Sequence, residues 1–401
     1  MSAVLFNPFA PGFTDNPYPH YRELRDTNPV QDHPLGFWVL SRHADVTTVL
    51  RAGLSAETRH LAPNPTRDAI QDAVGSEPWR SGGRSMIDRD PPDHTRLRGL
   101  VAKVFTPRAI AALEPRVTEL VDGALDTLAA QGGGDLVEEL AFPLPFTVIN
   151  EMLGMPPTDA DRVRALSGLL VRSLEPLTDV ELARRIRDAD HELSALVREV
   201  IAWKRAHPAD DLLTALVQAE SEGDKLTDDE LVAQVVLLYV AGHETTVNLV
   251  SNGVVALLRN PDQLAALRAD PELVGNAVEE LLRFDSPVQS SRRITVAPFE
   301  VGGREIPAGT FVIANLAAAN TDERFWGPDA AELRLDRANA RNHVSFGAGP
   351  HHCLGAALAR LEGRVAIGGL VQRFPDLALA GQVVWNGRIN LRGAEKVPIT
   401  V

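Results

Sequence analysis

The chain has 401 residues, of which 44% are hydrophobic, and its formal net charge is −14 at pH 7. This acidic balance, without any block of basic residues, argues against nucleic acid or an anionic membrane as a partner. The single cysteine excludes an intrachain disulfide framework, and the first residues lack the charged flank and long apolar core of a secretory signal. We therefore expect a cytoplasmic protein. Because no low-complexity linker interrupts the sequence, we also expect one domain over residues 1–401.

Three segments stand out in the first third of the chain. Phe37–Leu40 is a short apolar run of the kind that forms a strand. Further along, His94 and Arg98 lie four residues apart and so share one face of a predicted helix. For either basic side chain taken alone, a position on the surface is the simpler explanation. Gln131–Gly134 reads as a loop that is too short to link two domains.

The longest predicted helix begins at a capping box of Thr227 and Glu230 and ends before Asn260-Pro261, which gives about 32 residues or ~48 Å. Its uninterrupted apolar part, Val235–Gly242, is far shorter than the ~20 residues of a membrane span, so we expect a core helix. A glycine costs a helix interior about 1 kcal/mol relative to alanine, and a buried carboxylate costs more unless it is paired or hydrated. The glycine and the polar residues after it, His243-Glu244-Thr245, therefore indicate an opening of ligand size.

The pair His243-Glu244 also begins the H-E-x-x-H pattern of zinc protease helices, in which two histidines four residues apart share one face. Position 247 is Val247, so the second ligand is missing and we reject this function. Thr245 alone has a structural explanation, because its hydroxyl can bond back to its own helix.

The next helical segment carries Glu280 and Arg283 three residues apart, a spacing that stabilises an exposed helix by only ~0.2–0.5 kcal/mol. Strand-like residues return at 294–314, where Phe299–Gly303 and Ile306–Gly309 predict a hairpin, and again in the C-terminal tail. Most of the remaining sequence reads as helix.

The only cysteine lies in Phe346-Gly347-Ala348-Gly349-Pro350-His351-His352-Cys353-Leu354-Gly355. Apolar residues recur at helical spacing after it, at Leu354, Leu358, Leu361 and Val365, so a helix should begin near Cys353. The N–H groups and positive dipole end of a helix start favour a thiolate, the form in which cysteine binds a metal. Glycines remove side chains where the backbone approaches something large and flat. A lone cysteine is most often a small buried hydrophobe, but the surrounding pattern indicates a cofactor ligand.

This pattern, F-G-x-G-x-H-x-C-L-G, resembles the haem-binding loop of the cytochrome P450 superfamily, in which the cysteine is the axial iron ligand. Ala241–Thr246 is similar to the distal helix of that family, and Glu280–Arg283 to its E-x-x-R helix, and the three motifs occur in the family's order. The resemblance extends over nearly all 401 residues. It implies a mainly α fold with a small β region, in which the long distal helix crosses a buried haem b.

The resemblance also implies roles for single residues. Cys353 is the expected thiolate ligand of the iron, and Glu244 and Thr245 match the acid–alcohol pair that handles protons for oxygen cleavage. The residues matched to the haem propionates are His94, Arg98, His351 and Arg293, with Arg292 as a register alternative to Arg293. Other cofactor-binding positions are Phe346, Gly347, Gly355 and Ala241, and Arg337 is the expected partner of Glu280 and Arg283 in a structural ion cluster.

These matches imply a haem-thiolate monooxygenase that inserts one atom of O₂ into an apolar organic molecule by hydroxylation or epoxidation. No glycine-rich dinucleotide fingerprint follows a strand, so the electrons must come from another protein, by resemblance a ferredoxin with its reductase. Arginines that could dock an acidic carrier are Arg96, Arg108, Arg341, Arg360 and Arg364. The absence of a membrane anchor resembles the bacterial branch of the family.

Two other functions stay open. A peroxide-driven oxygenase is disfavoured by Glu244 and Thr245, because peroxide already carries the protons, and a haem-thiolate protein that binds or senses a ligand would show no turnover. Steroids, fatty acids, terpenes and polyketides all remain possible substrates. The segments that we associate with the substrate pocket are Ser81–Ile87, Leu166–Leu177, Val288–Ser291 and Ala394–Val397.

Overall fold

The structure, a computed structural model, describes residues 4–401 except 64, 66–68, 70–71, 74–84, 104, 156–159, 177–178, 219 and 222–223. Its contacts divide the chain into two compact units. Unit 1 comprises Met1–Ser55, Ile110–Pro145 and Thr245–Val401, and unit 2 comprises Ala56–Ala109 and Phe146–Glu244. A single domain over residues 1–401 stays a prediction.

A four-stranded sheet in unit 1 has the order β1-β2-β9-β6. The strands are β1 (Val30–His33), β2 (Phe37–Leu40), β6 (Ser290–Ile294) and β9 (Phe311–Asn315). β2 pairs parallel with β9, and the other neighbours are antiparallel. β2 has the bounds that the apolar run predicts, whereas the expectation missed β1, because three of its four residues are polar and give no strand signal.

Behind this sheet lies an apolar core that includes Trp38 and Leu40 from β2, Val312 from β9, and Val46 and Val49 from α2 (His43–Arg51). A buried aliphatic or aromatic side chain contributes roughly 1.5–3 kcal/mol to folding, so this cluster anchors the sheet.

The hairpin predicted after β6 is present as β7 (Phe299–Val301) and β8 (Arg304–Ile306). The prediction of a loop at Gln131–Gly134 is wrong in part, because β3 (Gly133–Asp135) pairs with β13 (Pro398–Thr400). A Cβ at Gly133 would lie 2.3 Å from the Ile399 carbonyl oxygen, so glycine is needed here for a close approach of two strands.

The other strands form short pairs. β13 also pairs with β10 (Ala378–Leu379), and the remaining strands are β4 (Glu220–Ser221), β5 (Asp224–Lys225), β11 (Val384–Trp385) and β12 (Ala394–Lys396). The tail therefore contains the expected strands, whereas β3, β4 and β5 were not expected.

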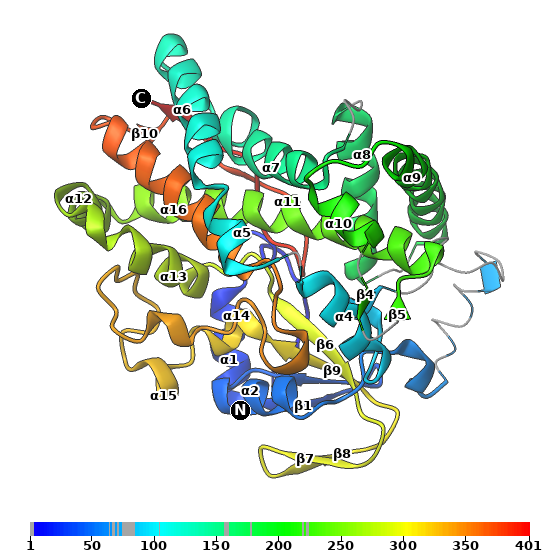
Figure 1. Cartoon of the computed structure of the whole chain (residues 1–401). Coiled ribbons are helices and arrows are strands. Elements are labelled where there is room, and N and C mark those ends of the chain that lie inside the picture. Colours follow the sequence, from blue (N-terminus) through cyan, green and yellow to red (C-terminus); the bar gives the residue numbers. More distant parts are fainter. Residues whose placement is uncertain are drawn as a thin grey trace. The chain divides into compact units, whose positions relative to one another are not determined.

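The helices of unit 1 are α1 (Tyr18–Thr27), α2, α6 (Glu114–Gln131), α12 (Pro261–Ala269), α13 (Val274–Phe284), α14 (Leu316–Ala319), α15 (Glu323–Trp326) and α16 (Ala356–Arg373). Figure 1 shows α6 and α16 side by side, and the exposed ion pairs Glu114–Arg364 and Asp126–Arg373 join them. α16 begins three residues after Cys353, close to where the apolar periodicity predicts.

The helices of unit 2 are α4 (Asp93–Ala102), α8 (Ala160–Leu170), α9 (Val180–Ala206) and α10 (Leu212–Gln218). Three further helices pass from one unit into the other: α5 (Pro107–Ala111), α7 (Pro143–Leu153) and α11 (Asp228–Arg259). Within the described part of the chain, no helix is both long enough and apolar enough to cross a membrane.

The ends of α11 agree with the sequence prediction. The Thr227 amide donates to Glu230 Oε2 at 2.9 Å, and the Glu230 amide donates to Thr227 Oγ1 at 3.2 Å, which is the predicted capping box. The helix ends at Arg259, directly before Asn260-Pro261, after 32 residues.

The unit 1 part of α11 packs closely on α16. A Cβ at Gly363 would lie 3.0 Å from Leu249 Cδ2, and a Cβ at Gly253 would lie 3.0 Å from Ile367 Cδ1. One glycine from each helix therefore lets the two approach each other closely.

Candidate haem-thiolate site

The segment before α16 forms a closed loop around Cys353. The Cys353 amide donates to the Phe346 carbonyl at 2.9 Å, and the Gly347 amide donates to the Val344 carbonyl at 2.8 Å. Cys353 itself is exposed, which is unusual for a cysteine that serves only as a small hydrophobe. The loop thus presents the single thiol of the chain at the surface of unit 1.

The three glycines of the loop differ in how far backbone conformation and packing require a glycine. Gly347 and Gly349 both have φ near +70°, and a Cβ at Gly349 would lie only 2.4 Å from the Leu50 carbonyl oxygen. A Cβ at Gly355 would meet no atom within 4 Å. The protein's own packing therefore requires glycine at position 349 but does not explain it at position 355.

A polar network holds the start of the loop. Asn320 Oδ1 accepts from the Val344 amide at 2.8 Å, and Asn320 Nδ2 donates to Ser345 Oγ at 2.8 Å. The Asn320 carbonyl in turn accepts from Arg283 Nη1 at 2.8 Å. Asn320 was not predicted, since its position between α14 and α15 carries no motif.

The structure brings Glu280, Arg283 and Arg337 together. Arg283 donates to both carboxylate oxygens of Glu280 at 2.7 Å, and Arg337 Nε donates to Glu280 Oε1 at 3.1 Å. Glu280 and Arg283 are completely buried, and Arg283 also donates to the carbonyls of Ala330 and Glu332. Because every charge here is paired inside the core, the cluster differs from the weak exposed helix pair considered above.

One face of α11 stays partly exposed across the middle of the helix. Its residues follow helical spacing and are Val236, Leu237, Val240, Ala241, Glu244 and Thr245. The neighbouring positions Leu238, Tyr239, His243 and Thr246 are buried. We call this stripe the partly exposed face of α11, and its mixture of apolar side chains with one acid and one alcohol is typical of a wall that contacts a ligand.

His243 has a structural role and does not belong to the face that could contact a ligand. Its Nδ1 lies 2.8 Å from the Tyr239 carbonyl, which can only accept, so Nδ1 carries the proton. Nε2 is therefore free to accept, and it lies 3.2 Å from Ser167 Oγ, which can also donate to the Arg164 carbonyl at 3.1 Å. The ring is buried and satisfied within unit 2, as is expected of a structural histidine.

Thr246 contacts a buried carboxyl group that was not predicted as a site residue. Its hydroxyl bonds the carboxyl of Glu362 in α16, and burial raises the pKa of Glu362 to about 8 although that hydrogen bond opposes the shift. Glu362 Oε1 is buried without a hydrogen-bond partner. A glutamate amid the apolar residues of α16 was the available signal for this position.

The basic candidates lie in both units. Arg293 is buried in β6, where Nη1 donates to Ser291 Oγ at 2.9 Å, and Arg292 beside it is partly exposed. His351 is partly exposed in a short 3₁₀ helix, Gly349–His351. In unit 2, α4 carries buried His94 and partly buried Arg98 one turn apart. Unit 1 thus contains Arg293 and His351, and unit 2 contains His94 and Arg98.

Three of the five arginines suggested for docking are paired with carboxylates: Arg96 with Glu230, Arg360 with Glu279, and Arg364 with Glu114. Arg108 and Arg341 are exposed. Their guanidinium groups are therefore the better candidates for contact with another protein.

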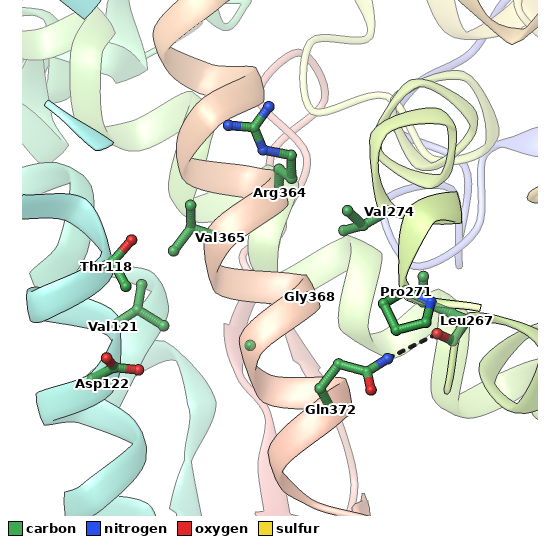
Figure 2. A pocket seen from close by; sticks show the side chains of 11 residues that line it. Thr118, Val121, Asp122, Leu267, Pro271, Val274, Arg364, Val365, Gly368 and Gln372 are labelled. Carbon is green, nitrogen blue, oxygen red and sulfur yellow. Dashed lines mark hydrogen bonds between the residues drawn. The ribbon is translucent and has the colours of Figure 1, made fainter. Parts of the chain in front are cut away.

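Figure 2 shows a pocket of about 300 Å³ in unit 1 among α6, α12, α13 and α16. Val121, Val274 and Val365 form apolar parts of its wall, and Gln372 bonds the Leu267 carbonyl at 2.9 Å beside it. No predicted catalytic or haem-binding residue lines this pocket, although Arg364, one of the arginines suggested for docking, does. Of the segments that we associated with the substrate pocket, 81–84 and 177 lie outside the described residues, and none of the others lines it.

A family model described as cytochrome P450 matches residues 170–382, more than half of the chain. A vitamin D(3) 25-hydroxylase of Pseudonocardia autotrophica is 44% identical over 404 residues, covering 98% of this chain and 96% of the relative. The chain belongs to the cytochrome P450 family.

Solved structures agree with this assignment. P450BioI in complex with a hexadec-9Z-enoic acid ligated acyl carrier protein has a TM-score of 0.88 at 32% identity, covering 98% of this chain and all of that one. CYP109E1 from Bacillus megaterium in complex with testosterone has a TM-score of 0.85 at 31% identity, covering 96% and 98%. The expected P450 fold, mainly α with a small β region, is confirmed, and the protein is a cytochrome P450 monooxygenase.

The residues of this P450 fit the thiolate-bound haem that the family implies. In unit 1, the exposed thiol of Cys353 lies two residues before Gly355, where an added Cβ would enter open space. A thiol donor beside a glycine that packing does not explain is what a large flat cofactor bound through a thiolate requires.

Proposed function

We propose that Cys353 is the axial ligand of haem b in this monooxygenase. The main support is that Cys353, the single cysteine of the chain, is exposed on a loop. The hydrogen bond from the Cys353 amide to the Phe346 carbonyl fixes the backbone of this loop. A thiolate at this position would gain from the adjacent start of α16, because the first N–H groups of a helix stabilise a negative charge. When bound, thiolate-ligated haem supplies the chemistry that activates O₂ for insertion into a carbon substrate.

Four basic residues would hold the two propionates: His94, Arg98, Arg293 and His351. Arginine suits this role because its guanidinium can bind a carboxylate through two parallel N–H groups. Phe346, Gly347, Gly355 and Ala241 would lie against the ring, since the glycines and the alanine leave room beside the backbone. Burial of Arg293 supports its selection over Arg292, which is partly exposed.

Glu244 and Thr245 would deliver protons at the distal side. Both lie on the partly exposed face of α11, so each can contact water as well as a ligand. Thr245 Oγ1 would donate a hydrogen bond into the site, and the Glu244 carboxyl would return a proton from water to it. Glu244 thereby acts as the general acid and Thr245 as its relay.

We further propose that the electrons come from a separate ferredoxin and its reductase, and that the enzyme works in the cytoplasm. Exposed Arg108 and Arg341 would attract an acidic carrier. Turnover supported by a ferredoxin should therefore slow as ionic strength rises, and a rate independent of salt would contradict docking by these charges.

An apolar organic molecule is the proposed substrate, hydroxylated or epoxidised with one atom of O₂. One relative is a vitamin D(3) 25-hydroxylase, and similar structures hold testosterone and a hexadecenoyl chain on acyl carrier protein. A secosteroid, a steroid and a free or carrier-bound fatty acyl chain therefore form the first screening panel. Product formation from one class alone would define the substrate.

The test of ligation is the reduced carbon monoxide difference spectrum of the purified protein beside Cys353→Ala and Cys353→His. A red-shifted thiolate band in the native protein, lost in both variants, supports the assignment. No bound haem, or the same band in the variants, overturns it.

A second measurement separates the two alternatives. Substrate-dependent consumption of reductant, matched by oxygenated product, would exclude a ligand sensor. Equal or better turnover with peroxide in Thr245→Ala would indicate the peroxide-driven reaction, because that reaction does not need the proton relay.

A further inference from the structure

A buried carboxylate joins three elements of unit 1 beneath the cysteine loop. Glu279 in α13 accepts from Arg360 Nε of α16 at 2.7 Å and from Arg360 Nη2 at 3.1 Å. The other partner is His343, whose Nε2 lies 3.0 Å from Glu279 Oε2. We name these three residues the Glu279 cluster. None of them belongs to the ion cluster of Glu280.

Hydrogen bonds determine the charges in this cluster. His343 Nδ1 accepts from the Ser345 amide at 3.1 Å, so the proton of the neutral ring must lie on Nε2 and point to Glu279. Burial lowers the pKa of His343, although Glu279 opposes that shift, which keeps the ring neutral near pH 7. The cluster therefore holds one negative charge, on Glu279, and one positive charge, on Arg360.

The cluster reaches Cys353 through one residue. The Arg360 guanidinium lies 4.6 Å from the centre of the Phe346 ring, within the range of a cation–π contact. The Phe346 carbonyl accepts the Cys353 amide, and the Phe346 ring also packs against the cluster of Leu249, Val278 and Leu282. His343 lies three residues before Phe346, and Ser345 lies directly before it. Glu279 is therefore linked to this segment in two ways, through its hydrogen bond with His343 and through Arg360, which contacts the Phe346 ring.

An exposed ion pair on the same helix provides a contrast. Arg373 pairs with Asp126, but the two side chains are 38% and 69% exposed, and such pairs contribute about 0–1 kcal/mol. The Glu279 side chain is only 5% exposed, although that of Arg360 is 36% exposed. A carboxylate bound by three N–H groups in the interior has a stronger field than a solvated pair.

We propose that the Glu279 cluster positions the Cys353 loop through Phe346 and balances the Arg360 charge beneath the proposed thiolate. This inference rests on Cys353 as the haem ligand. Glu279 and Arg360 are positioning residues, because they act on the ligand through Phe346 and the loop backbone.

The experiment measures the midpoint reduction potential of the haem-containing protein in Glu279→Gln, Arg360→Gln and the double variant. Glu279→Gln leaves the Arg360 charge uncompensated, and a positive charge would favour the reduced state, so the potential should become more positive. Arg360→Gln leaves the negative charge, so the potential should become more negative, and the double variant should return towards the native value. A loss of packing alone would not shift the reduction potential in opposite directions in the two single variants.

Loop position is read from the same samples. On warming, the thiolate band of the reduced carbon monoxide complex is replaced by the band of a complex without thiolate ligation, and the rate of this conversion is measured. The rate should be several-fold higher in both single variants than in Arg373→Gln, the matched control on α16. Single variants that shift the potential in the same direction, or that match Arg373→Gln in both measurements, overturn the inference. If the native protein lacks the thiolate band, the proposed function itself fails, and that outcome is seen before any variant is compared.

Discussion

The sharpest stability prediction concerns Glu362 of α16, because its carboxyl is fully buried against Thr246 of α11. Burial raises its pKa from 4.5 to about 8. The folded protein therefore binds a proton that the unfolded chain releases above about pH 4.5, so this residue makes the folded state less stable as the pH rises towards 8. The effect is small below pH 4.5 and complete above pH 8.

The size follows from the shift of about 3.5 pKa units, each worth about 1.4 kcal/mol. The whole effect is about 5 kcal/mol, and most of it falls between pH 5 and pH 8. Glu362→Gln keeps the shape of the side chain but cannot ionise. The free energy of unfolding of Glu362→Gln minus that of the native protein should therefore rise by about 3–4 kcal/mol over this interval.

The assay is equilibrium unfolding in urea at several pH values, followed by tryptophan fluorescence, with equal denaturant slopes required for the comparison. Glu279→Gln is the matched control. Although burial opposes the shift, hydrogen bonds from His343 and Arg360 lower the pKa of Glu279 to about 2, so its carboxyl is ionised in both states above pH 5. Its difference from the native protein should stay nearly constant from pH 5 to pH 8. Parallel curves for Glu362→Gln and the native protein would refute the reasoning.

Three further predictions concern the loop, the core and α11. Gly349→Ala should lose roughly 2–4 kcal/mol of stability in urea unfolding, because its Cβ would meet the Leu50 carbonyl oxygen and its φ is positive. Gly355→Ala should unfold like the native protein but bind less haem in absorbance titrations, because its Cβ would meet no atom of the protein. Equal stabilities of the two variants would contradict this difference. Glu280→Gln should lose about 3–5 kcal/mol, because buried Arg283 loses its carboxylate partner and Arg337 keeps only Asp329, and a melting temperature near the native value would show that the ion cluster adds little. Thr227→Ala should lose about 1 kcal/mol through the capping box, checked by the same unfolding curves, and no loss would mean that packing alone holds the start of α11.

Elements with local signals were predicted well. The start of α11 follows from Thr227 and Glu230, which are three residues apart, and β2 and the β7–β8 hairpin follow from short apolar runs and glycines. Capping and turn formation depend on neighbours in the chain, so the sequence displays them directly. β3 was missed because its glycines carry no strand signal and its partner, β13, lies more than 260 residues later.

The candidate site divides in the same way. The sequence by itself determined the family, the loop around Cys353 and the helix that carries Glu244 and Thr245, because each is a motif of neighbouring residues. Only the tertiary structure decided that Glu279 joins His343 and Arg360, and that Glu362 is buried against Thr246. The physical reason is that burial and ion pairing depend on which distant segments meet, and single charged residues have the same appearance in the sequence whether they lie in the core or in water.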